Sequence, residues 1–222
     1  MNNIVNNIWE EEHSSKRRVC MLMITHACNL KCSYCYETHK QNSYMTIDLA
    51  KDIILKEAKM IECSDQFDEI QIDFMGGEPL MNFSLIKDVV EWLESGAINV
   101  PWVCFASTNA TLINKDIRAW LKEHKKYMIL GISYDGTSRM QSKNRGTDQY
   151  DIDLDFFHEL WPEQTFQMTI SKETLPFLAE GVLSVQHRGY EINASLAQGV
   201  DWTMEDAKLY REQLCLLKEA YL

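Results

Sequence analysis

Three closely spaced cysteines, Cys28, Cys32 and Cys35, constrain this chain more than any other feature of its sequence. They follow an apolar run, residues 19–25, whose composition is typical of a β-strand. A compact loop with the spacing Cys-x3-Cys-x2-Cys can turn three thiolates toward one small object, and iron–sulfur clusters are held by such thiolates. A [4Fe–4S] cluster bound in this way keeps one iron without a protein ligand, and that iron is free to bind another molecule.

Other uses of three cysteines stay open on the motif alone. A structural zinc site needs four ligands and usually pairs two short motifs, so His26 or His39 would have to complete it. A disulfide pair and simple packing are the remaining alternatives.

Length and charge narrow the class of protein. The chain has 222 residues, enough for one domain with a sizeable core, and a formal net charge of −11. This charge disfavours a nucleic-acid partner, because phosphate contacts need a basic face, but it permits a basic peptide partner. No segment has the length and apolarity of a membrane span, and the polar N-terminus is unlike a signal peptide. We therefore expect no membrane association and a reducing, cytoplasmic location.

The order of apolar and amphipathic runs predicts the fold class. Residues 1–17 are polar and are expected to form an N-terminal arm, with one domain over residues 18–222. The patterns predict strands over 19–25, 70–75, 102–107, 128–134, 166–171 and 190–195, and helices over 46–61, 83–93, 114–124, 152–160, 177–187 and 203–221. Thr46, Asn114 and Thr203 are expected helix caps, and Gly96 is an expected helix stop. Strands that alternate with helices, several of them nearly all apolar, indicate an α/β fold with a parallel sheet covered by helices.

In such folds the functional groups gather at the carboxyl ends of the strands. The cysteine loop follows the first predicted strand, and Gly76-Gly77-Glu78-Pro79 follows the second. Asn109 follows the third strand and Ser133-Tyr134-Asp135-Gly136 the fourth, while Asn193 is placed near the end of the sixth. Each motif alone is also ordinary turn chemistry.

Together these motifs resemble the radical S-adenosylmethionine (radical SAM) superfamily. The string CNLKCSYCY at residues 28–36 is similar to the branch of anaerobic sulfatase maturases and SPASM-type peptide maturases. Gly76–Pro79 is similar to the family's GGEP motif, and the Ser133-x-Asp135-Gly136 segment, with Arg145 ten residues after Asp135, resembles the family's Ser-x-Asp-Gly segment. Two departures stand out: Gln141-Ser142 replaces His-Asp, and Ala110 replaces a more usual glycine.

The resemblance implies a partial (β/α)6 TIM-like barrel, an open three-quarter barrel of parallel strands; the strand count alone also fits a doubly wound sheet. It implies a [4Fe–4S] cluster on Cys28, Cys32 and Cys35 and S-adenosylmethionine (SAM) on the fourth iron. The implied SAM contacts are Tyr34 beside the adenine, Gly76, Gly77, Glu78 and Pro79 at the amino group, Arg145 at the carboxylate, and Ser133, Asp135, Asn109 and Asn193 elsewhere in the site.

The implied activity is reductive cleavage of SAM to a 5′-deoxyadenosyl radical that abstracts hydrogen from a peptide or protein substrate. Its electron would come from an external low-potential donor of the flavodoxin or ferredoxin type. The C-terminal extension with further cysteines that such maturases carry is not recognisable, so we expect either an enzyme that works with one cluster or a catalytic core that relies on a separate partner domain or subunit for substrate binding. Two alternatives remain: a non-catalytic iron–sulfur or metal-binding module, and a radical SAM enzyme acting on a small metabolite.

Overall fold

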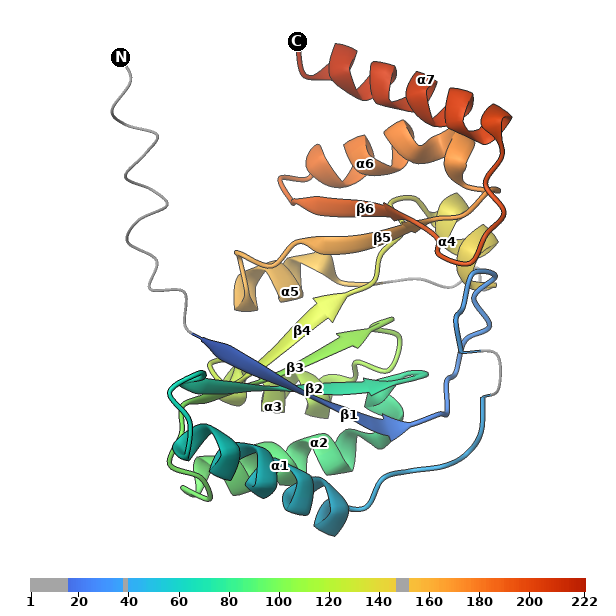
Figure 1. Cartoon of the computed structure of the whole chain (residues 1–222). Coiled ribbons are helices and arrows are strands. Elements are labelled where there is room, and N and C mark those ends of the chain that lie inside the picture. Colours follow the sequence, from blue (N-terminus) through green and yellow to red (C-terminus); the bar gives the residue numbers. More distant parts are fainter. Residues whose placement is uncertain (1–15, 38–39, 147–151) are drawn as a thin grey trace, which may run out of the picture.

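The computed structural model describes residues 16–37, 40–146 and 152–222, and Figure 1 shows the whole chain. The strands are β1 (Arg17–Thr25), β2 (Glu69–Gly76), β3 (Trp102–Thr108), β4 (Met128–Ile132), β5 (Phe166–Ile170) and β6 (Ile192–Leu196). The α-helices are α1 (Ile47–Glu62), α2 (Phe83–Glu94), α3 (Lys115–His124), α4 (Ser138–Arg145), α5 (Leu154–Leu160), α6 (Leu178–Gln186) and α7 (Met204–Ala220). Two 3₁₀ turns, η1 (Pro79–Asn82) and η2 (Leu175–Phe177), precede α2 and α6.

The strands form two parallel sheets, one in the order β1-β2-β3-β4 and one of β5 and β6. A single bridge between Ser133 and Gln167 connects them, together with a hydrogen bond of 2.8 Å from the Tyr134 amide to the Gln167 carbonyl. In Figure 1, α1, α2 and α3 cover one side of the larger sheet, and α6 and α7 lie beyond β5 and β6 on the far side. The predicted partial barrel of parallel strands is confirmed, and it is not closed.

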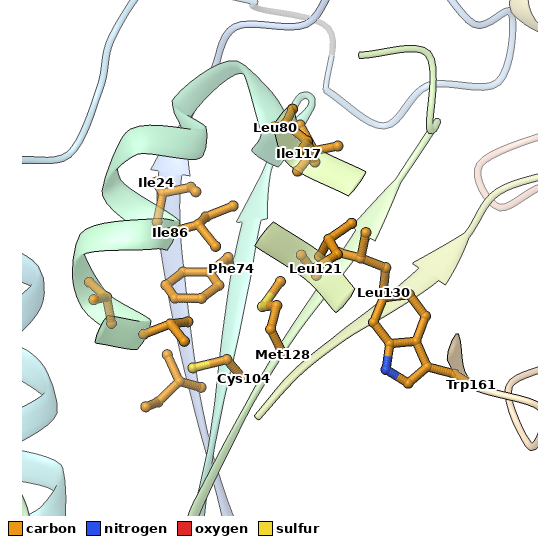
Figure 2. Close-up of a cluster of buried hydrophobic side chains, with 14 of the residues drawn as sticks. Ile24, Phe74, Leu80, Ile86, Cys104, Ile117, Leu121, Met128, Leu130 and Trp161 are labelled. Carbon is orange, nitrogen blue, oxygen red and sulfur yellow. The ribbon is translucent and has the colours of Figure 1, made fainter. Parts of the chain in front are cut away.

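The core lies between the larger sheet and its helices. Alternate residues of β1, namely Cys20, Leu22 and Ile24, are buried there against α1. Figure 2 shows the same layer around Phe74 and Ile86. Within the described residues, helices cover β1 on one face only. Its other face exposes a short apolar row, Val19, Met21 and Met23.

The expected helix signals are present. The Thr46 side chain accepts a hydrogen bond from the Leu49 amide at 3.4 Å, and Asn114 caps α3 in the same way. Thr203 and Asp206 form a reciprocal capping box at the start of α7. Gly96 follows α2 with φ of +84°, a conformation that glycine adopts without steric cost.

Three details differ from the sequence expectations. β1 already begins at Arg17, so the last residue of the predicted arm belongs to the sheet, while residues 1–15 lie outside the described part. Helix α4 was not predicted. On α7, Leu214 is 43% exposed, and Gln213 is buried instead, where its Oε1 accepts from the Ala179 amide of α6 at 3.1 Å. Among the described helices, none is long and apolar enough to cross a membrane.

Candidate active site at the carboxyl ends of the strands

A cavity of about 180 Å³ opens at the carboxyl edge of the strands, between the loops that follow β1 to β4 and the inner side of β5. It gathers most of the residues predicted from sequence: Cys28, Cys32, Tyr34, Cys35, Gly76, Gly77, Glu78, Asn109, Ser133 and Arg145. Sequence reasoning assigned no site role to five further lining residues: Tyr36, Lys40, Ser107, Thr108 and Thr169. Three predicted residues, Pro79, Asp135 and Asn193, are not part of the lining.

The cysteine loop forms one wall of this cavity. All seven cysteines of the chain are free thiols, so no disulfide competes for them. Among the residues that the structure describes, no three His, Cys, Asp or Glu side chains converge on a single metal ion. His26 instead pairs with Glu37 at 3.0 Å, and His39 lies outside the described residues. All three cysteines of the loop line the same cavity, as a cluster bound by three thiolates requires.

Two opposing influences act on the pKa of the Cys32 thiol. Burial raises the pKa of the Cys32 thiol, and the positive charge of Arg145 opposes that rise. Cluster ligands must be thiolates, so the guanidinium supports the ligand role of Cys32.

Gly76 and Gly77 let the loop after β2 press against the cysteine loop. A Cβ on Gly77 would lie 2.6 Å from the Ala27 carbonyl oxygen and 2.9 Å from Cys28 Cβ. The Glu78 amide donates to the Ala27 carbonyl at 2.8 Å. Only glycine therefore permits this approach, which fixes the backbone beside the first cysteine.

The Glu78 carboxylate ties the loops after β2 and β3 together. It is 1% exposed and accepts hydrogen bonds from Thr108 Oγ1 at 2.7 Å, the Asn109 amide at 2.8 Å and the Leu80 amide at 3.1 Å. Burial raises its pKa despite these donors. A carboxylate already held by three donors is engaged within the protein, so the neighbouring backbone carbonyls become the better candidates to accept an ammonium group.

Asn109 stabilises its own turn and also reaches the cysteine loop. Its side-chain oxygen accepts from the Thr111 amide at 3.0 Å, and its Nδ2 donates to Asn29 Oδ1 at 3.0 Å. The next residue, Ala110, has φ of +61°, the left-handed region that favours glycine. The backbone at this position therefore has an angle that glycine adopts without steric cost.

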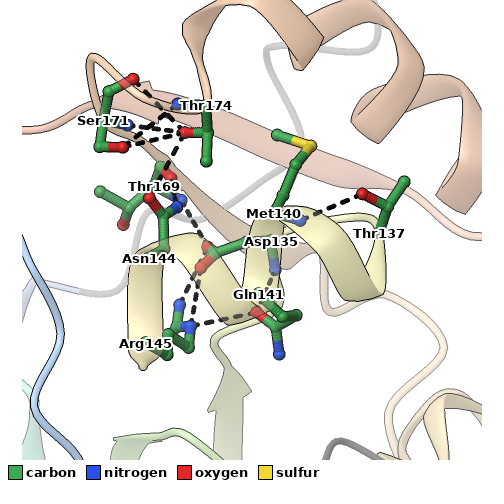
Figure 3. A network of polar contacts seen from close by, with 9 residues as sticks. All are labelled: Asp135, Thr137, Met140, Gln141, Asn144, Arg145, Thr169, Ser171 and Thr174. Carbon is green, nitrogen blue, oxygen red and sulfur yellow. Dashed lines mark hydrogen bonds and ion pairs between the residues drawn. The ribbon is translucent and has the colours of Figure 1, made fainter. Parts of the chain in front are cut away.

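A buried ion pair joins α4 to the end of β4 (Figure 3). Arg145 Nε and Nη2 donate to Asp135 Oδ2 and Oδ1 at 2.8 and 3.0 Å, and both side chains are buried. Burial is the largest single influence on the pKa of Arg145 and lowers it, but Asp135, together with Tyr34 and Cys32, raises it further, so the net shift is upward. The expected two-bond clamp of Arg145 thus holds Asp135, while the guanidinium also lines the cavity 5.8 Å from the Tyr34 ring centroid. Its contact with the SAM carboxylate stays a prediction.

Gln141 and Asn144 extend this network in both directions. Gln141 Oε1 accepts from the Asp135 amide at 2.8 Å and from Arg145 Nε at 3.1 Å, which gives the unusual glutamine a bracing role. The Asn144 carbonyl accepts from the Ser33 amide at 2.7 Å, and its Nδ2 donates to the Thr169 carbonyl at 2.7 Å. Helix α4 therefore connects the cysteine loop with β5.

The position predicted for Asn193 is wrong. β6 begins at Ile192, two residues later than expected, so Asn193 is the second residue of the strand rather than one near its end. It is exposed and pairs in register with Gln167, outside the cavity lining. Pro79 opens η1 and is buried beneath the loop.

A parallel partial barrel with a three-cysteine loop at its carboxyl edge is the arrangement of a radical SAM core. The family described as "4Fe-4S single cluster domain" matches residues 17–152. The chain belongs to this family and to the radical SAM superfamily, as the motifs predicted, with a [4Fe–4S] cluster and SAM as its cofactors.

Relatives with curated sequences differ in their reported roles. An uncharacterized protein of Methanocaldococcus jannaschii is 39% identical over 52% of this chain and 38% of its own length. The radical SAM cyclopropyl synthase TigE of Paramaledivibacter caminithermalis is 28% identical, over 62% of the chain and 31% of its length. Fe-coproporphyrin III synthase of Methanosarcina barkeri is 33% identical, over 59% and 30%. The matches span only about a third of each relative.

Solved structures share the fold. Native anSMEcpe with bound AdoMet and the Kp18Cys peptide aligns with a TM-score of 0.72 at 17% identity, over 89% of this chain and 58% of that one. SuiB of Streptococcus suis bound to its precursor peptide SuiA aligns with a TM-score of 0.65 at 17% identity, over 93% and 47%.

Proposed function

We propose that this chain is the catalytic core of a radical SAM enzyme that modifies a peptide or protein. The observation that carries the proposal is the meeting of three cysteines from one loop with Gly76, Gly77 and Arg145 around a single cavity. The core corresponds to residues 18–222.

Each wall of the cavity has a task in this proposal. Cys28, Cys32 and Cys35 hold the cluster, and the backbone carbonyls beside Gly76 and Gly77 accept the amino group of SAM. When bound, the cluster and SAM would supply the chemistry: SAM is reductively cleaved to a 5′-deoxyadenosyl radical, which takes a hydrogen atom from the substrate. Arg145, fixed by Asp135, presents a positive charge to the carboxylate of SAM.

The hydroxyl groups of Ser133 and Thr169 line the cavity beside Arg145 and are suited to nucleoside hydroxyls. The buried network behind them fixes Arg145 and the backbone of Thr169, so that little reorganisation of these groups accompanies the reaction.

Two comparisons support a peptide substrate. Both anSMEcpe and SuiB, which share this fold, are solved with peptides bound. The net charge of −11 also favours a basic partner over an acidic one. We further propose that a separate domain or subunit contributes to substrate binding and that a flavodoxin- or ferredoxin-type donor supplies the electron.

A second candidate is chemistry on a small metabolite. The similarity to Fe-coproporphyrin III synthase favours this candidate, because the name of that enzyme indicates a porphyrin product.

The deciding experiment uses anaerobically purified, reconstituted protein. We expect about four irons per chain and formation of 5′-deoxyadenosine and methionine from SAM with dithionite. Replacing Cys28, Cys32 and Cys35 by Ala should remove both iron and product. A double variant of the exposed thiols, Cys63→Ala and Cys215→Ala, is the matched control and should retain both. Iron-free wild-type protein after reconstitution would refute the proposal.

A further inference from the structure

Within the described part of the chain, no helix covers the second face of the larger sheet at β1 and β2, and this face carries the carboxylate of Asp73. On β1 and β2 the residues that pack against the helices alternate with Met21, Met23, Gln71 and Asp73, which therefore point to the opposite side. Asp73 is half-buried in this row. A carboxylate amid methionines on a strand calls for an explanation, because ionised groups are costly to desolvate without a partner.

Hydrogen bonds hold Asp73 in place without neutralising it. Arg17 Nη1 donates to Gln71 Oε1 at 3.0 Å, and Gln71 Nε2 donates to Asp73 Oδ1 at 2.7 Å. The charge of Arg17 is matched by Glu69. Within the described part of the chain, no ion pair includes Asp73. The Asp73 carboxyl group is thus oriented by Gln71 and has no cationic partner among the described residues.

The two strand neighbours of Asp73 are a thioether and an aromatic ring. Met21 lies opposite it on β1 and Phe105 opposite it on β3. Neighbouring strands are about 4.8 Å apart, so both side chains flank the carboxylate on the same face. The Phe105 ring fits over Gly131, where a Cβ would lie 2.7 Å from its Cζ, and Met21 is 70% exposed. A carboxylate beside an aromatic ring and a polarizable thioether is a favourable setting for an organic cation.

The row leads directly to the cavity. Asp73 precedes Gly76 by three residues on the same strand, about 10 Å at the rise of a parallel strand. A molecule with one end in the cavity can therefore place another group at Asp73.

We propose that Asp73, flanked by Met21 and Phe105, binds the cationic side chain of a lysine or arginine in the peptide substrate. This inference rests on the proposed function, because it assigns a specificity to the same reaction. The methylene stem of such a side chain packs along Met21 and Phe105 while its charged end reaches the carboxylate.

The test uses the reconstituted holoprotein labelled with ¹³C at its methionine methyl groups, with the Met21 resonance assigned through Met21→Leu. The probes are Nα-acetyl-lysine amide and Nα-acetyl-norleucine amide, which differ only by the charged amine. We expect the lysine probe to shift the Met21 resonance and to bind about 10-fold or more tightly than the norleucine probe. Asp73→Asn should abolish the preference, and Asp68→Asn, the same charge change at an exposed position, should keep it.

Equal binding of the two probes by wild-type protein would overturn the inference, and this arm needs no variant. An unchanged preference in Asp73→Asn would also overturn it. Substrate-free formation of 5′-deoxyadenosine, measured on the same samples, separates the two proposals. Its absence alongside a lysine preference would refute the radical function and leave the cation site standing.

Discussion

The loops on the β1–β3 side of the cavity meet through close backbone contacts and the buried Glu78 carboxylate, whereas the β5–β6 sheet is joined to the larger sheet by one short backbone bridge and a buried ion pair. On the first side, Gly77 lies against Ala27, and the Glu78 carboxylate draws two loops together. On the second side, the Thr169 amide donates to Asp135 Oδ1 at 3.1 Å across the break between the sheets, and Arg145 holds the same carboxylate (Figure 3). We call the first region the backbone side, because its closest approach is between main chains. We call the second the side-chain junction, because a buried ion pair reinforces its short bridge.

The largest expected effect comes from breaking the side-chain junction. Asp135→Ala leaves Arg145 buried without its partner and removes the acceptor of the Thr169 amide. We expect a loss of about 3–5 kcal/mol in the free energy of unfolding, the usual cost of an unpaired buried charge. Denaturant unfolding measures the loss, and hydrogen exchange should show it first in β5 and β6.

The paired variant Asp135→Leu with Arg145→Leu provides the control. Because it removes both charges, it should recover part of the stability. Equal stability of Asp135→Ala and the wild type would contradict the role given to this pair.

An intermediate effect is expected for the backbone side. In Glu78→Gln the new amide group faces the Asn109 amide, so a donor meets a donor, and we expect a loss of about 1–3 kcal/mol. Burial raises the pKa of Glu78 above its ordinary 4.5, so the folded chain holds this proton more tightly than the unfolded chain. The wild type therefore loses this contribution as pH rises above about 4.5, and the variant does not.

The stability gap between wild type and Glu78→Gln should accordingly be widest in acid. Unfolding measured across a pH series tests this sign, and Glu62→Gln, an exposed carboxyl on α1, serves as the control. A gap that widens toward neutral pH would show that burial does not govern the pKa of Glu78.

The smallest expected effect is a gain in thermal stability. Ala110 has φ of +61°, which costs an L-residue about 1 kcal/mol relative to glycine. Ala110→Gly should therefore raise the melting temperature modestly, although the added chain entropy of glycine in the unfolded state offsets part of the gain. Thr111→Gly, a change at a neighbouring position without a positive φ, should not raise it. A lower melting temperature in Ala110→Gly would mean that packing of the methyl group outweighs the strain.

The backbone side of the cavity could be predicted from sequence, since short motifs specify it. The cysteine spacing and the two glycines lie within a few residues of strands with clear apolar patterns, and parallel strands bring their following loops to one edge. The caps at Thr46, Asn114 and Thr203 were likewise readable, because each is a local hydrogen bond.

The side-chain side was harder to predict because its partners are distant in sequence. Helix α4 has a single apolar buried residue, Met140, so its periodicity is weak, although Thr137 and Gly146 mark its two ends. No local sequence pattern indicated that Thr169 lines the cavity, or that the Glu78 carboxylate accepts hydrogen bonds from Thr108, Asn109 and Leu80. The late start of β6, which displaced Asn193, depends on its pairing with β5 rather than on its own composition.

The contact between Gly77 and Ala27 has a consequence for how iron arrives. Small zinc modules fold only when their metal binds. Here contacts with the adjoining loop, none of which involves a metal, hold the backbone beside Cys28. This backbone therefore does not depend on a metal for its position, and cluster insertion should require no refolding of this part of the loop.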